Sequence, residues 1–415
     1  MKKGWMRTFA LGMAVSLLGA CAKEEQAEEE LAELDAESAL AELREELNEG
    51  EDIEQAGKKR PSGDGTLNPN LAAMTEGEVE ILYTNEKPVM LYDMDGFFVS
   101  IDKYQITKVS DVNRLSESIF NGETGGYVVT ASMTIENNRK TPVYYSNYAS
   151  INLEGRQDRV TGNTYYFVPQ NEMLRSDHPE ELDLYSPGFK KQGFQSFVMT
   201  EEQYAKMENT HPKIVIPGNA REKKDDYSRK YGDAVFDFPY SDAYEKELAS
   251  APVFYQDEFV NQNLGTKTML FEKKGIGQVL SLGGVDVEFD GVEYTEVDVS
   301  PAQMDKFYRF EEGDVIYALT AKFRIENNSE ETLELGAIYS TIYDANGNRY
   351  RREGMLEPDK IRVLEPGESG EKFHVFLLTE EELEQIDSPI LTFGPFGGND
   401  KRLFKGRDLA FKIPY

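Results

Sequence analysis

Apolar and polar side chains alternate along one stretch of this chain, and the same alternation returns 190 residues later. In residues 127–138 (YVVTASMTIENN) and 317–328 (YALTAKFRIENN), the odd positions are apolar or aromatic and the even positions are mostly polar. A period of two with one apolar face predicts a strand of a β-sandwich, and the closing Asn-Asn pair favours a turn. The repetition indicates an internal duplication.

Two further blocks recur in the same order. Residues 197–202 (FVMTEE) match residues 376–381 (FLLTEE), and FDFPY at 236–240 matches FKIPY at 411–415. In the first pair, a threonine is followed three residues later by glutamine or glutamate, which is the spacing of a helix capping box. A short helix is therefore expected directly after each of these strands.

The duplication and the alternation together predict an all-β fold with short helices. We expect two tandem antiparallel β-sandwich domains, at residues 76–240 and 252–415, because no strand–helix–strand rhythm indicates a parallel sheet. Residues 241–251 are charged and are expected to form a helical connector.

The repeated motifs also resemble a known group of proteins. Tyr-x-(Leu/Val)-Thr-Ala…Ile-Glu-Asn-Asn, a later Pro-Gly and the following Phe-x-(Leu/Met)-Thr resemble the immunoglobulin-like domains of unknown function in uncharacterised Gram-positive extracytoplasmic lipoproteins. They are also similar in pattern to the mycobacterial immunoprotective extracellular protein. This resemblance implies an immunoglobulin-like sandwich and an extracytoplasmic setting, and it implies no catalytic residues.

The N-terminus has the order of a lipoprotein signal peptide. Basic residues precede an apolar run at 8–18, which is long enough for a signal peptide and too short to span a bilayer. Leu18-Gly19-Ala20-Cys21 resembles the lipobox of bacterial lipoproteins, in which the cysteine takes a diacylglycerol and becomes the new N-terminus. We therefore expect residues 1–20 to be removed and lipidated Cys21 to anchor the protein on the extracytoplasmic face of the cell membrane.

Residues 21–75 are expected to form an acidic spacer and linker. Leucines recur at helical spacings between residues 31 and 47, while 15 acidic residues face only two basic ones between residues 23 and 57. A solvated spacer of partial helicity is favoured over a coiled coil, because the apolar repeat covers too few heptads.

Charge and cysteine content exclude several kinds of function. The net charge of −31 makes nucleic acid an unlikely partner, because the protein and the phosphate backbone are both negatively charged and repel each other. Cys21 is the single cysteine, so neither an intramolecular disulfide nor a thiolate site is expected. Three histidines without ligand spacing, and the lack of a Gly-x-Ser-x-Gly elbow or a phosphate-binding loop, predict a non-enzymatic protein without cofactors. Of these histidines, His374 lies in a predicted strand and is expected to point away from the face that its apolar neighbours fill.

Clustered tyrosines are the candidate binding surface. Tyr144 and Tyr145 are adjacent, as are Tyr165 and Tyr166. Adjacent residues of one strand cannot both face the core, so one tyrosine of each pair is expected on the outer face. An exposed tyrosine strip would suit contact with a glycan or a protein, although aromatic residues in sandwiches more often belong to the core.

Two acidic loops have weak features of calcium sites. Asp344, Asn346 and Asn348 place oxygen-bearing side chains at alternate positions. The Asn-Gly between them is also the usual signal for a tight hairpin, and the hairpin interpretation is favoured because no distal glutamate follows. For the Asp93-Met94-Asp95-Gly96 loop, a tight turn is likewise favoured over a calcium site.

These observations leave two hypotheses about function. The leading one is a lipid-anchored, non-enzymatic protein whose sandwiches bind an envelope protein or a wall polymer. The alternative is a solute-binding lipoprotein that serves a transporter. A large pocket between the domains would favour the alternative, and a flat aromatic patch would favour the leading hypothesis.

Overall fold

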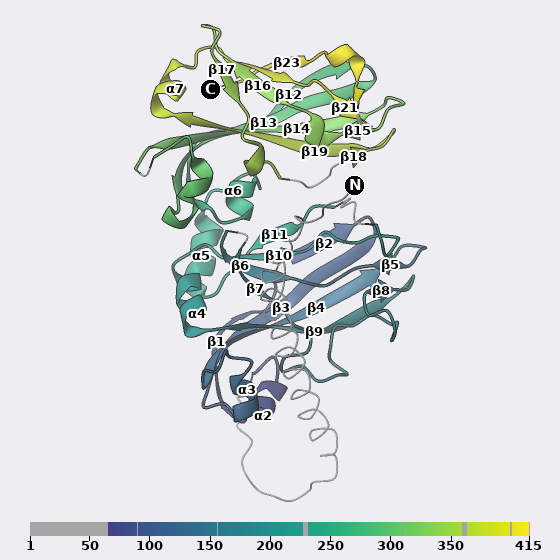
Figure 1. Cartoon of the computed structure of the whole chain (residues 1–415), viewed down its shortest axis with the longest axis vertical. Helices are drawn as coiled ribbons and strands as arrows, with labels where there is room; N and C mark the ends of the chain where they lie inside the picture. Colours follow the sequence, from purple (N-terminus) through teal and green to yellow (C-terminus); the bar gives the residue numbers. More distant parts are fainter. Residues whose placement is uncertain are drawn as a thin grey trace, which may run out of the picture.

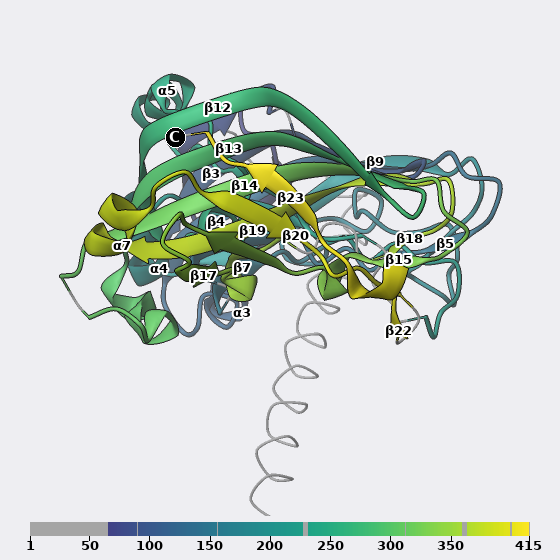
Figure 2. The ribbon, with the colours of Figure 1, turned by 90° about the horizontal axis from the view of Figure 1, so that it is seen from above.

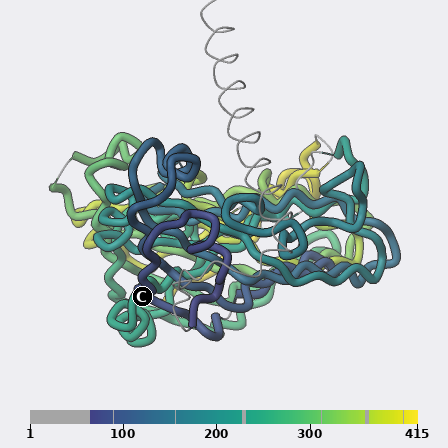
Figure 3. Tube along the Cα trace, turned by 90° about the horizontal axis from the view of Figure 1, so that it is seen from below, coloured from purple at the N-terminus to yellow at the C-terminus, as the bar shows by residue number. Residues whose placement is uncertain are grey.

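The computed structural model describes residues 65–88, 90–155, 157–226, 231–311, 313–358, 363–398 and 401–414. The expected signal peptide, Cys21 and most of the acidic spacer lie outside the described residues. The described chain forms two β-sandwiches, which are stacked along the long axis of the molecule (Figure 1). Seen from below, the first sandwich lies in front of the second (Figure 3). The predicted all-β, antiparallel fold with short helices is confirmed.

The first sandwich consists of two main antiparallel sheets and short connecting elements. The first sheet has the order β1-β3-β4-β9, with β2 also paired to β3, and the second has the order β11-β10-β6-β7. Its strands are β1 Glu78–Asn85, β2 Met90–Met94, β3 Phe97–Ser110, β4 Gly125–Asn137, β5 Val143–Tyr144, β6 Ser150–Glu154, β7 Asp158–Thr161, β8 Leu184–Tyr185, β9 Lys190–Met199, β10 Lys213–Ile216 and β11 Ala234–Asp237. Its helices are α2 Asn70–Thr75, α3 Arg114–Glu117 and α4 Glu201–Glu208, and α5 Asp242–Ser250 leads to the second sandwich.

The second sandwich repeats the order of both main sheets, with the long strand β12 in the place of β1 and β2 and with β21 and β22 as an additional pair. Its main sheets have the orders β12-β13-β14-β19 and β17-β16-β20-β23. Figure 2 shows the four strands of the first of these sheets side by side, with β20 and β23 of the other sheet over them. Its strands are β12 Gly265–Leu282, β13 Val285–Val299, β14 Ile316–Asn327, β15 Leu333–Glu334, β16 Ser340–Tyr343, β17 Arg349–Arg351, β18 Val363–Leu364, β19 Ser369–Thr379, β20 Ile390–Phe393, β21 Gly397–Gly398, β22 Lys401–Arg402 and β23 Leu409–Lys412. Its helices are α6 Glu258–Asn261, η2 Pro301–Phe307, η3 Leu335–Ala337, η4 Gly354–Leu356, α7 Glu380–Gln385 and η5 Phe404–Gly406.

The repeated sequence motifs have structural roles. The alternating stretches form β4 and β14, and both predicted capping boxes are present, at Thr200 before α4 and at Thr379 before α7. The first asparagine of each Asn-Asn pair is fully buried. The side-chain amide of Asn137 donates to the backbone oxygens of Thr141, Tyr185 and Ser186. In the second copy, Asn327 makes two of the three equivalent bonds, to the backbone oxygens of Glu331 and Leu364. These asparagines therefore connect loops that would otherwise leave buried carbonyl groups without donors.

In both copies, the segment that precedes the first strand packs on the outer face of the first sheet. The Leu67 amide donates to Gln105 Oε1 at 2.8 Å, and the Tyr255 amide donates to Glu293 Oε1 at 2.7 Å. Gln105 lies opposite Thr130, and Glu293 lies opposite Thr320, so the two acceptors occupy equivalent positions. Residues 67–75 belong to the predicted linker, yet they form this cover for the first sandwich. The second sandwich has a similar cover in residues 254–264.

None of the helices in the described part of the chain is long and apolar enough to cross a membrane.

Candidate binding cleft between the sandwiches

The two sandwiches touch at one side of the molecule and separate at the other. At the contact, the Asn263 amide donates to the backbone oxygen of Leu153, and the Ser300 hydroxyl donates to Glu154. The Lys206 ammonium lies 2.8 Å from the same Glu154 carboxylate. On the opposite side, β2 and β11 of the first sandwich face β18 and β19 of the second (Figure 1). The space between these strands is the cleft.

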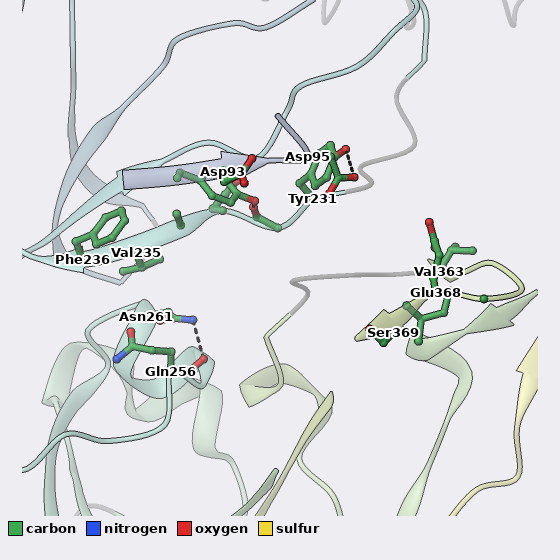
Figure 4. A pocket seen from close by; sticks show the side chains of 16 residues that line it. Asp93, Asp95, Tyr231, Val235, Phe236, Gln256, Asn261, Val363, Glu368 and Ser369 are labelled. Atoms are coloured by element: carbon green, nitrogen blue, oxygen red, sulfur yellow. Dashed lines mark hydrogen bonds between the residues drawn. The ribbon is translucent and has the colours of Figure 1, made fainter. Parts of the chain in front are cut away.

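The cleft has a volume of about 670 Å³ and is lined by both sandwiches. Val235 and Phe236 of β11 form one wall, opposite Gln256 and Asn261 (Figure 4). The Pro-Gly turn before β19 contributes Glu368 and the residues around it. Since each wall belongs to a different sandwich, the cleft exists only in the assembled two-domain chain.

Acidic side chains surround the opening of the cleft. Asp93, Asp95, Asp233 and Glu368 line it, whereas the described lining contains no lysine, arginine or histidine. The Tyr231 hydroxyl donates to Asp95 Oδ2 at 2.8 Å. The Arg139 guanidinium lies behind this pair and donates to the Tyr231 hydroxyl at 2.9 Å. The lining therefore favours positively charged groups, with tyrosine and phenylalanine rings available for apolar contact.

Asn261 is the most buried polar residue of the lining. The residue is 7% exposed, and its side-chain amide nitrogen donates to the backbone oxygen of Gln256 at 3.1 Å. Its side-chain oxygen is buried and has no hydrogen-bond partner among the described residues. An acceptor buried without a donor is costly, but this oxygen has almost no accessible surface, so the carboxylates rather than Asn261 are the polar groups that the cleft offers to a ligand.

The predicted tyrosine surface is only partly formed. Tyr145 is fully buried among the core rings, so its inclusion in a binding surface is wrong. Tyr144 lies on the outer side, in agreement with the expectation that one tyrosine of the pair faces outwards. Its hydroxyl donates to Glu181 at 3.1 Å. Tyr165 and Tyr166 lie in a turn rather than a strand, and both are half-buried. The structure therefore shows no flat patch made by these four residues.

The loop with Asp344, Asn346 and Asn348 closes a hairpin between β16 and β17. Asp344 Oδ1 accepts from the backbone amides of Asn346 and Asn348, and Oδ2 accepts from the Asn348 side chain at 2.7 Å. Burial alone would raise the pKa of Asp344, but these hydrogen bonds outweigh it and lower the pKa. The carboxylate thus serves the turn itself. Over the described residues, no three histidine, cysteine, aspartate or glutamate side chains form a group that could hold a metal ion, and this includes the Asp93–Asp95 loop.

His374 points away from the face that its neighbour Val375 fills, as expected, but that direction leads into the core. It is fully buried and points into the sandwich, with its ring 5.3 Å from that of Phe393 in the opposite sheet. Its Nδ1 lies 2.8 Å from Glu357 Oε1, and the Glu357 carboxylate also accepts from Arg352 at 2.6 Å and contacts Lys372 at 2.9 Å. Because the carboxylate supplies a partner for the ring, the strand tolerates a polar residue at an inward position.

Among the residues that line the cleft, Asp93 and Asp95 could be recognised in the sequence as possible functional residues, whereas Gln256 and Asn261 could not. Asp93 and Asp95 stood out as an acidic loop, but only the fold brings them opposite the second sandwich. Gln256 and Asn261 lie in a short segment with no distinctive pattern, and they face the cleft because α6 packs at the domain boundary.

Comparison with known proteins gives a similarity without a function. The family model described as a domain of unknown function (DUF5068) matches residues 54–241. No curated protein matches the chain. A functionally unknown protein from Listeria monocytogenes is similar in structure, with 20% identity over 41% of this chain and 93% of its own, at a TM-score of 0.37.

An uncharacterised β-sandwich protein from Clostridium difficile is 11% identical, covers 34% of this chain and 91% of its own, and has a TM-score of 0.23. The YjhA protein from Bacillus subtilis is 14% identical over 34% of this chain and 100% of its own, at a TM-score of 0.24. The first sandwich, with the residues just before it, is thus similar in sequence to the DUF5068 family of unknown function.

Proposed function

We propose that this chain is a lipid-anchored, extracytoplasmic protein that acts by binding, and that its ligand occupies the cleft between the two sandwiches. The cleft itself carries the proposal, because it combines a volume of about 670 Å³ with four lining carboxylates and no basic side chain among the described lining residues. Sites for small molecules or single side chains usually have volumes of about 300–1,000 Å³.

The preferred ligand is a positively charged group on an envelope protein or a wall polymer. Four carboxylates line the cleft, and the aromatic rings of Tyr92 and Phe236 lie beside them. An ammonium or guanidinium group on an apolar stem would match both features, since the cation meets the carboxylates and the stem meets the rings.

The alternative is capture of a free solute for a transporter. The location of the cleft between two domains favours it, because solute receptors commonly hold a ligand between two lobes. The four predicted surface tyrosines form no flat patch that would favour a purely surface-bound partner, because Tyr145 is fully buried and the other three are half-buried.

The anchoring part of the proposal depends on Leu18-Gly19-Ala20-Cys21, which lies outside the described residues. The lipid and the acidic spacer would hold the two sandwiches away from the membrane surface.

The proposal is tested by photo-crosslinking from intact cells. A photoreactive amino acid is placed at Val235 or at Ser369, on opposite walls of the cleft, and at Tyr308 as a matched control, which is 85% exposed and does not line the cleft. We expect both cleft positions to capture the same ligand and Tyr308 to capture none. A captured chain or polymer supports the preferred ligand, and a small mass addition supports the solute. Equal capture at Tyr308 would refute the assignment of the cleft.

A further inference from the structure

Three charged side chains meet in a buried cluster on the outer face of the first sheet of the second sandwich. Asp257 precedes α6, Lys267 lies on β12 and Glu293 lies on β13. Lys267 Nζ is 2.5 Å from Asp257 Oδ2, and these side chains are 2% and 0% exposed. Such complete burial of an ion pair is costly unless other groups compensate for the lost water.

Aromatic rings and a second acid enclose this pair. Lys267 Nζ lies 5.9 Å from the ring centre of Phe254 and 5.8 Å from that of Phe259. Glu293 is fully buried, and its Oε2 has no hydrogen-bond partner among the described residues. Burial raises the pKa of Glu293 to about 7, although the charge of Lys267 opposes this shift. Glu293 can therefore both accept and release a proton near neutral pH.

The two oxygens of Asp257 have different partners. Oδ1 accepts from the Val260 backbone amide at 3.1 Å, as expected for the residue that caps α6. Oδ2 accepts from the Thr320 hydroxyl at 3.0 Å and is also the oxygen next to Lys267. One oxygen is thus held by a backbone donor, while the other lies between a hydroxyl and an amine.

We propose that Lys267 and Asp257 become joined by an intramolecular amide bond. The lysine nitrogen, after giving up a proton, attacks Cγ of Asp257 and forms the new C–N bond. The bond from Cγ to Oδ2 breaks, and Oδ2 leaves as water. The ammonium and carboxylate are together converted into one amide and one water molecule, so no oxidant, reductant or further reactant is required.

Each neighbouring group has a place in this step. The Val260 amide stabilises the negative charge that develops on Oδ1, in the manner of an oxyanion-binding donor. The Thr320 hydroxyl supports the departing Oδ2. Glu293 carries a proton from the amine to the leaving oxygen, and the aromatic rings exclude water that would hydrolyse the product.

The bond would be particular to the second sandwich and would affect the cleft. In the first sandwich, the position of Glu293 is occupied by Gln105, which cannot carry a proton in this way. In the second, the linked residue lies between Gln256 and Asn261, both of which line the cleft. A covalent link from this segment to β12 would hold that wall of the cleft in place.

Peptide mass spectrometry of the full-length protein tests the proposal. Denatured protein is digested with a protease that cleaves after glutamate, because the bond after Glu258 separates Asp257 from Lys267. We expect the two resulting peptides to remain joined, at a combined mass that is one water molecule below their sum. Separate peptides of unchanged mass in the wild-type protein would overturn the proposal, whatever the variants show. This readout does not depend on the lipid at Cys21.

Two conservative variants test the roles of the residues. Lys267→Arg keeps the positive charge but lacks the reactive amine, and Glu293→Gln keeps the shape but cannot carry the proton. Both should give separate peptides, and circular dichroism shows whether each variant remains folded. A joined peptide in folded Lys267→Arg would overturn the assignment of the bond. A fully joined peptide in folded Glu293→Gln would overturn the role of Glu293.

Discussion

Replacing Glu357 by glutamine tests the buried network around His374. Burial alone would raise the pKa of Glu357, but His374, Lys372 and Arg352 outweigh it and lower the pKa to about 2. An ordinary glutamate in the unfolded chain has a pKa of 4.5. A shift of this size corresponds to about 3 kcal/mol of stability at neutral pH, at about 1.4 kcal/mol per pKa unit. Loss of one partner from a buried ion network typically costs about 3–5 kcal/mol, which agrees with this value.

The pH dependence follows from the direction of the shift. Because the pKa is lowered in the folded protein, the stabilisation is present above pH 4.5 and disappears as the pH falls towards 2. Burial also lowers the pKa of His374, so this residue adds to the loss of stability at acidic pH. We therefore expect Glu357→Gln to be about 3 kcal/mol less stable than the wild type at pH 7, with a smaller difference at pH 3.

Urea unfolding followed by circular dichroism measures both values, since the single tryptophan, Trp5, lies in the expected signal peptide. Glu331→Gln is the matched control, because Glu331 pairs with Lys401 at the surface, where the side chains are 40% and 53% exposed. This control should change stability by less than about 1 kcal/mol. An equal loss for Glu357→Gln at pH 7 and pH 3 would refute the electrostatic explanation.

Further predictions address the core, the caps and the anchor. Asn137→Ala should cost about 1–3 kcal/mol, because it leaves buried carbonyl groups without a donor. Tyr145→Ala should cost about 3–5 kcal/mol and Tyr148→Ala less than about 0.5 kcal/mol, since their exposures are 0% and 67%; equal losses would contradict this difference in burial. Thr379→Ala removes a helix cap and should cost about 1 kcal/mol. The stabilities of these four variants are measured by urea unfolding. Cys21→Ala should move the protein from the membrane fraction to the soluble fraction, and retention of the same processed, membrane-bound form would contradict lipidation.

The elements that the sequence predicted best are those set by local pattern. The alternation at 127–138 and 317–328 predicted β4 and β14, and the threonine spacing predicted the capped helices α4 and α7. Such signals depend on residues that are only a few positions apart, so a short segment of the sequence contains all the information that they need.

The expectations that failed concern the direction and partners of single side chains. The local pattern separated His374 from the face of Val375, but it did not show which of the two faces is the core, where Glu357 provides a buried partner for the ring. The core position of Tyr145 depends on rings from β3 and β8, which are distant in the sequence. Packing between the sheets decides these positions, and the local sequence pattern carries no information about that packing.

By itself, the sequence determined the duplication, the antiparallel sandwich class and the positions of β4, β9, β14 and β19, because strand periodicity and turn chemistry are local properties. Only the tertiary structure decided that Asp93 and Asp95 lie opposite Asn261 across a cleft, and that Asp257, Lys267 and Glu293 meet in one buried cluster. These groupings depend on strand register and on the docking of two domains. Both are set by the burial of surfaces whose residues are far apart along the chain.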